Sequence, residues 1–141
     1  MIVAALVGVP LLAVGIAHLL WSLGIMWPIR DSKLLARTVV GTPGVARMPP
    51  KPLTFVTAVL IFAACVVAFS VADPTSGGGG LTALALLVGL AFLARGALGY
   101  TSWWARRTPE EPFRSLDRTN YAPLCLALGA GFLVLVVPRL T

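Results

Sequence analysis

Hydrophobic residues follow one another in four long runs separated by polar segments. The runs cover about residues 2–28, 53–73, 81–104 and 120–138. Each reaches or approaches the roughly 18 residues that a helix needs to cross the hydrocarbon core of a bilayer. Because a chain in lipid must satisfy its own backbone hydrogen bonds, runs of this length are expected to be helices. The pattern predicts an all-α membrane protein, a four-helix transmembrane bundle in one domain over residues 1–141.

The composition favours a membrane protein over a soluble one. Hydrophobic residues make up 58% of the chain and charged residues 11%, whereas soluble domains have about 25% charged residues. The first run follows Met1 with no Lys or Arg before Arg30. A secretory signal peptide has a basic start and a short apolar core, so we interpret the first run as a retained membrane helix.

The basic residues lie mainly in two of the three connections and predict an orientation. They are Arg30, Lys33, Arg37, Arg47 and Lys51 in the first connection, and Arg106, Arg107, Arg114 and Arg118 in the third. Since Lys and Arg accumulate in cytoplasmic loops, loops 29–52 and 105–119 are expected in the cytoplasm and both termini on the outer side. The net charge of +6 is then explained by topology and contact with anionic membrane lipids, and no nucleic-acid partner is expected.

Both basic loops also carry helix-capping signals. Asp31 or Ser32 is expected to cap a short amphipathic helix at the start of the first loop. In the second loop, Thr108 is expected to cap another helix, with Glu111 completing a capping box.

Two polar side chains inside the apolar runs predict a site. Arg95 lies nine residues before Trp104, roughly 13 Å from the inner end of its expected helix. His18 lies ten residues before Pro28, roughly 15 Å from the inner end of the first helix. A strip of small residues would let another helix approach closely beside Arg95: Gly89, Gly96 and Gly99. The similar depths favour a small polar pocket that opens toward the cytoplasm, lined by His18, Trp21, Arg95, Tyr100, Tyr121 and Cys125.

A structural role for the same polar residues stays open. A charge at the bilayer centre costs about 3 kcal/mol, and Arg95 can offset that cost by reaching Asp117 or helix-end carbonyls. A charge held by Asp117 can still face a ligand. For His18, a neutral ring bonded to a neighbouring helix is favoured over a proton relay. Cys65 and Cys125 lie at expected depths of roughly 18 and 7 Å, so neither a disulfide nor a metal site is expected, and no cofactor is predicted.

Several of these residues stand in motifs that resemble a known family. The motifs are His18-Leu-Leu-Trp21, Trp27-Pro28, Arg95-Gly-Ala-Leu-Gly-Tyr100 and the stretch EPFRSLDRTNYAPLCLALG. Over nearly the whole chain, the sequence is similar to an uncharacterised bacterial family of small four-helix integral membrane proteins. The resemblance implies a multi-pass protein of the bacterial inner membrane and brings no assigned activity.

Three classes of function follow from this site. A binding or accessory module would hold a lipophilic or anionic ligand, or a partner subunit, because the Arg95 guanidinium offers a fixed fork of donors to a carboxylate or phosphate. A membrane enzyme acting on a lipid-soluble substrate would use His18 as acid or base, but no carboxylate lies within the apolar runs to orient that ring. A transporter fits least, because four helices are few for alternating access unless a homo-oligomer supplies more. The sequence favours the binding or accessory module, with membrane lipids and a protein partner or second copy as its partners.

Overall fold

The computed structural model describes residues 1–140, and helices are the regular elements of that range. Four helical segments are long and apolar enough to cross a membrane: α1 (Ile2–Ser22), α3 (Lys51–Val71), α4 (Gly78–Leu98) and the segment Phe113–Arg139. The last comprises α6 (Phe113–Leu116), the π-helical turn η1 (Asp117–Tyr121), α7 (Ala122–Val136) and η2 (Val137–Arg139). Each of the first three has 21 residues and is therefore about 30 Å long, enough to cross the hydrocarbon core. The prediction of an all-α protein with four helices long and apolar enough to span a membrane is confirmed.

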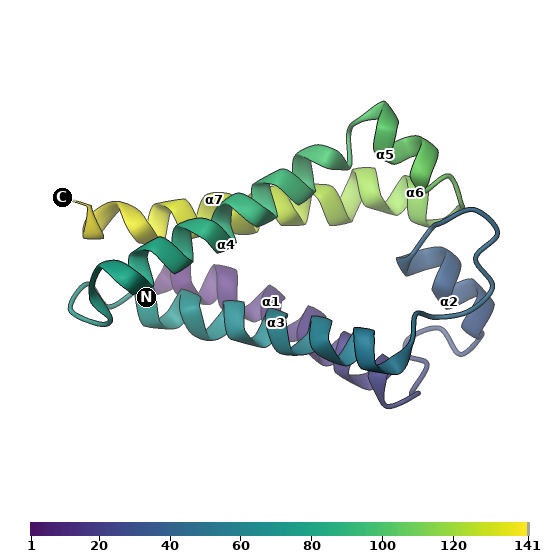
Figure 1. Cartoon of the computed structure of the whole chain (residues 1–141), viewed down its shortest axis with the longest axis horizontal. Coiled ribbons are helices and arrows are strands. Elements are labelled where there is room, and N and C mark those ends of the chain that lie inside the picture. Colours follow the sequence, from purple (N-terminus) through teal and green to yellow (C-terminus); the bar gives the residue numbers. More distant parts are fainter. Residues whose placement is uncertain (141) are drawn as a thin grey trace.

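Short helices lie in the two connections that carry most of the basic residues. They are α2 (Ser32–Val39), between α1 and α3, and α5 (Ser102–Arg107), between α4 and α6. Figure 1 shows α2, α5 and α6 at one end of the molecule, with both termini and the α3–α4 connection at the other. The two basic loops therefore lie at the same end.

The long helices form two antiparallel pairs. α1 packs along α3, and α4 packs along α7, with fewer contacts between the pairs. Figure 1 shows the pairs close together near the termini and diverging toward the end that carries α2. A buried cluster joins them where they are close, and it includes Val7, Leu11, Ala68, Val71, Phe132 and Leu135.

Glycines set the close approach of α4 to α7. A Cβ atom added at Gly96 would lie 2.9 Å from the backbone oxygen of Ala122, and one added at Gly99 would lie 2.6 Å from the Cβ of Ala122. At Gly89 the added atom would lie 2.9 Å from the Cβ of Phe132. The small-residue strip expected along the third run therefore does allow a neighbouring helix to approach, and that helix is α7.

Two of the membrane helices end earlier than the hydropathy pattern indicated. The first ends at Ser22 instead of about residue 28, and Gly24 follows with a φ of +85°, a left-handed conformation that stops the helix. The third ends at Leu98 instead of about residue 104. There the hydroxyl of Thr101 accepts the backbone N–H of Trp104 and starts α5 as a separate helix, because an N-cap provides an acceptor for a free donor of the first turn.

The fourth membrane helix begins earlier than expected, at Phe113 instead of about residue 120. Its π-helical turn is closed by the N–H of Ala122, which donates to the carbonyl of Asp117. Pro123 follows directly, and in a regular α-helix its ring would clash with the carbonyl four residues before it. The wider turn relieves that clash, so the chain continues as a helix through a proline.

Of the two predicted helix caps, the one in the first basic loop is confirmed and the one in the second is wrong. The Asp31 carboxylate accepts the N–H of Leu34 and caps α2, as predicted. Thr108 does not cap a following helix, because its hydroxyl donates to the carbonyl of Trp104 at the end of α5. Glu111 accepts instead from the backbone N–H and hydroxyl of Ser115.

Arg139 closes the end of the molecule that carries the termini. Its guanidinium donates to the Thr82 hydroxyl and to the backbone oxygens of Val71, Asp73, Ser76 and Gly78. Nearby, hydrogen bonds from the hydroxyl and N–H of Thr75 lower the pKa of the Asp73 carboxyl, and the charge of Arg139 lowers it further. The stability this gives is present at neutral pH and is lost as the pH falls through the lowered pKa.

Candidate functional site

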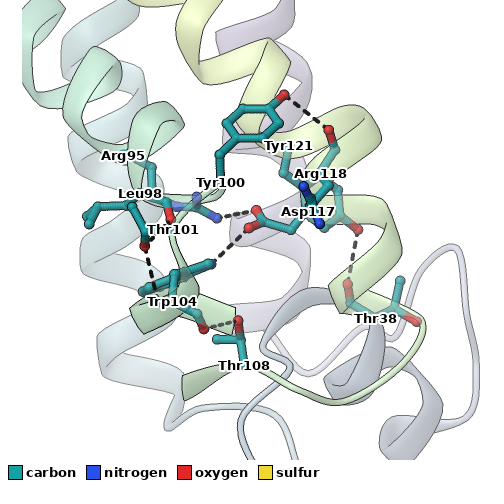
Figure 2. A network of polar contacts seen from close by, with 10 residues as sticks. All are labelled: Thr38, Arg95, Leu98, Tyr100, Thr101, Trp104, Thr108, Asp117, Arg118 and Tyr121. Atoms are coloured by element: carbon teal, nitrogen blue, oxygen red, sulfur yellow. Dashed lines mark hydrogen bonds and ion pairs between the residues drawn. The ribbon is translucent and has the colours of Figure 1, made fainter. Parts of the chain in front are cut away.

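An ion pair between Arg95 and Asp117 lies at the centre of the site (Figure 2). Nη2 of Arg95, in the last turn of α4, lies 2.6 Å from Oδ1 of Asp117, in the π-helical turn η1. The Asp117 side chain is 2% exposed and that of Arg95 is 31% exposed. Each charge therefore compensates the other where water is scarce. The pairing expected between these two residues is confirmed.

Trp104 completes the coordination of the carboxylate. Its indole N–H donates to Oδ2 of Asp117 at 2.8 Å, so each carboxylate oxygen accepts one hydrogen bond. The same indole ring lies 4.8 Å from the guanidinium carbon of Arg95, at cation–π distance. Trp104 was not predicted as a site residue, because the apolar run over residues 81–104 predicts one straight helix that carries both Trp104 and Arg95. The break between α4 and α5 allows the indole to approach Asp117.

Arg95 lies closer to a helix end than the sequence indicated. It is three residues before Leu98, the last residue of α4, and is thus about 5 Å from the end of the helix instead of roughly 13 Å. His18 is four residues before the end of α1, or about 6 Å. The expected similarity in depth stands, but both lie near helix ends. A cation in the last turn also interacts favourably with the helix dipole, so Arg95 is less costly there than at the bilayer centre.

His18 and Trp21 are not brought together with the ion pair. Nδ1 of His18 lies 2.8 Å from the carbonyl of Val14, in its own helix, and its ring lies 4.9 Å from that of Trp21. The indole N–H of Trp21 donates to the carbonyl of Trp27 at 2.7 Å. Within residues 1–140, no hydrogen bond or ring contact joins either residue to Arg95. Because α1 pairs with α3, the shared pocket with His18 is not formed, and the ring is bonded within its own helix instead of to a neighbouring one.

The other predicted site residues lie on the Arg95 side of the molecule. The Tyr121 hydroxyl donates to the carbonyl of Thr38 at 3.1 Å and so connects α2 to η1 (Figure 2). The Tyr100 hydroxyl donates to the carbonyl of Arg118 at 3.1 Å and is exposed. Cys125 is a free, partly buried thiol on α7. Among the described residues, no cluster of three or more His, Cys, Asp and Glu could hold a metal ion.

A solvent-open cavity of about 480 Å³ lies beside the ion pair, between the two basic loops. The first loop and the end of α2 provide one side, with Val39, Val40, Thr42 and Pro49. The second side is formed by Arg95, Trp103, Trp104, Arg107, Thr108 and Phe113. In the part of the chain that the structure describes, no acidic side chain lines this cavity. A second cavity, of about 450 Å³, lies beside Arg139 at the other end, where the guanidinium is already bonded to several oxygens.

The charged side of the cavity is formed mainly by two guanidinium groups and two indole rings, those of Arg95, Arg107, Trp103 and Trp104. The guanidinium of Arg107 lies 4.8 Å from the ring of Trp103, which lies 6.2 Å from the ring of Trp104. Arg107 forms no ion pair within residues 1–140. Nη1 of Arg95 is buried and has no hydrogen-bond acceptor there. Since a buried polar group without a partner is costly, the hydrogen-bonding capacity of Arg95 is not fully used by Asp117.

The hydrogen bond from Trp104 to Asp117 should have a measurable effect on stability. In Trp104→Phe the aromatic face beside Arg95 is kept, but one buried carboxylate oxygen loses its donor. We expect a loss of about 2 kcal/mol, since a hydrogen bond to a charged group is lost. The free energy of unfolding in mixed detergent micelles measures this change. Trp103→Phe is the control, because Trp103 is exposed and no hydrogen bond of its indole is present, and an equal loss in both variants would contradict the role of Trp104.

These features define the class: a multi-pass helical membrane protein with a cationic, aromatic-lined cavity at one end of its long helices. Residues 11–132 match the family model described as protein of unknown function (DUF3995), and the chain belongs to this family. The match covers most of the chain and includes Arg95, Trp104 and Asp117, so the resemblance to a family without an assigned activity is confirmed. Neither a curated protein nor a solved structure matches the chain.

Proposed function

We propose that this protein is a membrane-embedded binding or accessory module whose cavity between the two basic loops takes an anionic, amphipathic ligand. The observation that carries this function is a cavity lined by two guanidinium groups, those of Arg95 and Arg107, and by no acidic side chain among residues 1–140. A phosphate or carboxylate in the cavity provides a counter-charge to both guanidinium groups. Asp117 already compensates one of the two charges, so a singly charged anion balances the site.

The chemistry of the lining supports an amphipathic anion over a free inorganic one. Guanidinium groups bind phosphate and carboxylate with paired donors. The two indole rings and the aliphatic side chains of Val39 and Val40 offer apolar contact to the rest of the ligand. Arg95 lies near the end of a membrane-spanning helix, at the level where lipid headgroups are found. A phospholipid with an exposed phosphate is the ligand that combines these properties, and an acidic side chain of a partner subunit would compete for the same donors.

The cavity is proposed to face the cytoplasm of a bacterium, with both termini outside the inner membrane. The positive charge of the two basic loops supports this orientation, because such loops remain on the cytoplasmic side. In intact cells, a membrane-impermeant maleimide should label Ser76→Cys in the α3–α4 connection but not Ala46→Cys in the first loop. Both positions are outside the membrane helices, and labelling of Ala46→Cys alone would establish the opposite orientation.

Lipid binding by the purified protein tests the proposed ligand. In native mass spectrometry, short-chain phosphatidic acid should bind more tightly than short-chain phosphatidylcholine, whose headgroup has no net charge. Arg107→Gln should weaken phosphatidic acid binding about tenfold, because one charge-assisted hydrogen bond is lost. Arg106→Gln is the matched control, since this neighbouring arginine is exposed and does not line the cavity. Equal binding of the two lipids, or equal losses in the two variants, would contradict the site.

A further inference from the structure

We propose that Glu110 is a positioning residue for this site, and that it holds residues 37–44 of the first loop across the cavity. In this arrangement a ligand contacts both loops only while they are docked. The inference rests on the proposed function for its ligand, whereas the docking itself rests on contacts between residues that are far apart in the sequence.

Glu110 contacts residues 37–44, which we call the docked segment, at three points. Its Oε2 lies 3.2 Å from Nε of Arg37, in an ion pair without the alignment of a hydrogen bond. Its Oε1 accepts the backbone N–H of Gly44 at 3.1 Å. Its own backbone N–H donates to the carbonyl of Gly41 at 3.2 Å. One residue of the second loop thus holds a side chain, an N–H and a carbonyl of the first.

Packing brings the same segment onto the second loop. Gly41 is buried, has a φ of +71°, and leaves the space that its Cβ would fill to the ring of Phe113. The Phe113 ring lies 5.7 Å from that of Tyr121, whose hydroxyl donates to the carbonyl of Thr38. The docked segment is therefore held by hydrogen bonds and by an aromatic contact that only glycine allows.

The docked segment also forms part of the cavity. Val39, Val40 and Thr42 lie within it and line the side opposite Arg95 and Arg107. Between Val40 and Pro50 the chain has no regular secondary structure, so its position depends on contacts with the second loop. Loss of those contacts would leave the two arginines on an open surface.

Ligand binding and loop docking should therefore be coupled. A ligand that touches both sides of the cavity favours the docked state, and the docked state favours the ligand by the same factor. Electrostatics alone predicts the opposite for Glu110, because removal of a negative charge from the loop that carries Arg107 should strengthen the binding of an anion. The sign of the effect consequently separates the positioning role from a simple change of charge.

The experiment compares Glu110→Ala with Glu111→Ala in the full-length protein. Both variants lose one negative charge from the same loop, but Glu111 bonds only to Ser115 of its own loop. We expect Glu110→Ala to weaken the binding of short-chain phosphatidic acid about threefold to tenfold, since the ion pair with Arg37 and the hydrogen bond from the Gly44 N–H are lost. Hydrogen exchange of the amides of Gly41, Thr42 and Gly44 should become faster in Glu110→Ala and stay at the wild-type rate in Glu111→Ala. Added lipid should slow this exchange in the wild type.

A second pair of variants checks the docking by packing instead of by charge. Gly41→Ala places a methyl group against Phe113, whereas Gly44→Ala meets no atom within 4 Å and has a similar φ of +66°. Backbone strain is therefore similar in both, and only Gly41→Ala should weaken lipid binding and increase the exchange of the amides of residues 41, 42 and 44.

Failure of this inference is distinguishable from failure of the proposed function. If the wild type binds phosphatidic acid and Glu110→Ala binds it as tightly or more tightly, the positioning role is overturned and the ligand site stands. If the wild type binds neither lipid, the ligand site and its contact with both loops are overturned. In that case the exchange rates of the two alanine variants still decide whether Glu110 holds the docked segment.

Discussion

Replacement of Asp117 by asparagine should destabilise the folded protein by about 3 kcal/mol, at the lower end of the range for breaking one side of a buried ion pair. The substitution keeps the shape of the side chain and removes its charge, so Arg95 is left in the last turn of α4 without a compensating anion. The effect is at the lower end because the Arg95 side chain is 31% exposed and can reach water. Equilibrium unfolding in mixed detergent micelles, followed by tryptophan fluorescence, measures the loss.

A double substitution tests whether the loss of stability arises from an unpaired Arg95 charge or from the loss of the ion pair itself. In Arg95→Leu/Asp117→Asn neither charge is present and an amide oxygen is kept for the indole N–H of Trp104, so most of the lost stability should return. Glu111→Gln is the matched control, because that acid is exposed and should change stability by less than about 0.5 kcal/mol. If the double variant is as unstable as Asp117→Asn, the instability does not arise from an uncompensated guanidinium.

Gly96→Leu should separate α4 from α7 and destabilise the protein by about 3 kcal/mol, at the upper end of the cost of overpacking. The first added atom would already lie 2.9 Å from the backbone oxygen of Ala122 and 2.7 Å from the side chain of Leu126. A backbone oxygen cannot rotate away as a side chain can, so the two helices must move apart. The same unfolding measurement detects the loss.

The neighbouring alanine provides the control for Gly96. Ala97 is exposed on the same helix, so in a membrane its side chain faces lipid or a partner, and Ala97→Leu should leave stability nearly unchanged. Because Arg95 is adjacent, Gly96→Leu should also disturb the ion pair with Asp117. Equal stability of the two leucine variants would show that α4 and α7 are not closely packed at this position.

The presence of four long helices was predictable from the sequence, because a chain in lipid must be helical. Apolar runs of this length must bond their own backbone groups, so their helical state follows without knowledge of the fold. Their ends were less predictable, since Gly24 and the Thr101 cap end helices inside stretches that remain apolar or aromatic. The pairing of Arg95 with Asp117 was one of the expected alternatives because few acids are available in this chain.

The sequence by itself determined four membrane helices, two basic loops between them and a guanidinium in need of an anion. Tertiary structure alone decided that α1 pairs with α3 and α4 with α7, which keeps His18 from the Arg95 cluster and forms a cavity from two loops. The physical reason is that hydropathy predicts only whether a helix is stable in lipid. Which helices pair depends on how closely their surfaces fit, as where Gly96 lies against the backbone of Ala122. Side chains such as Trp104 and Glu110 acquire their partners only after that pairing has fixed where the loops lie.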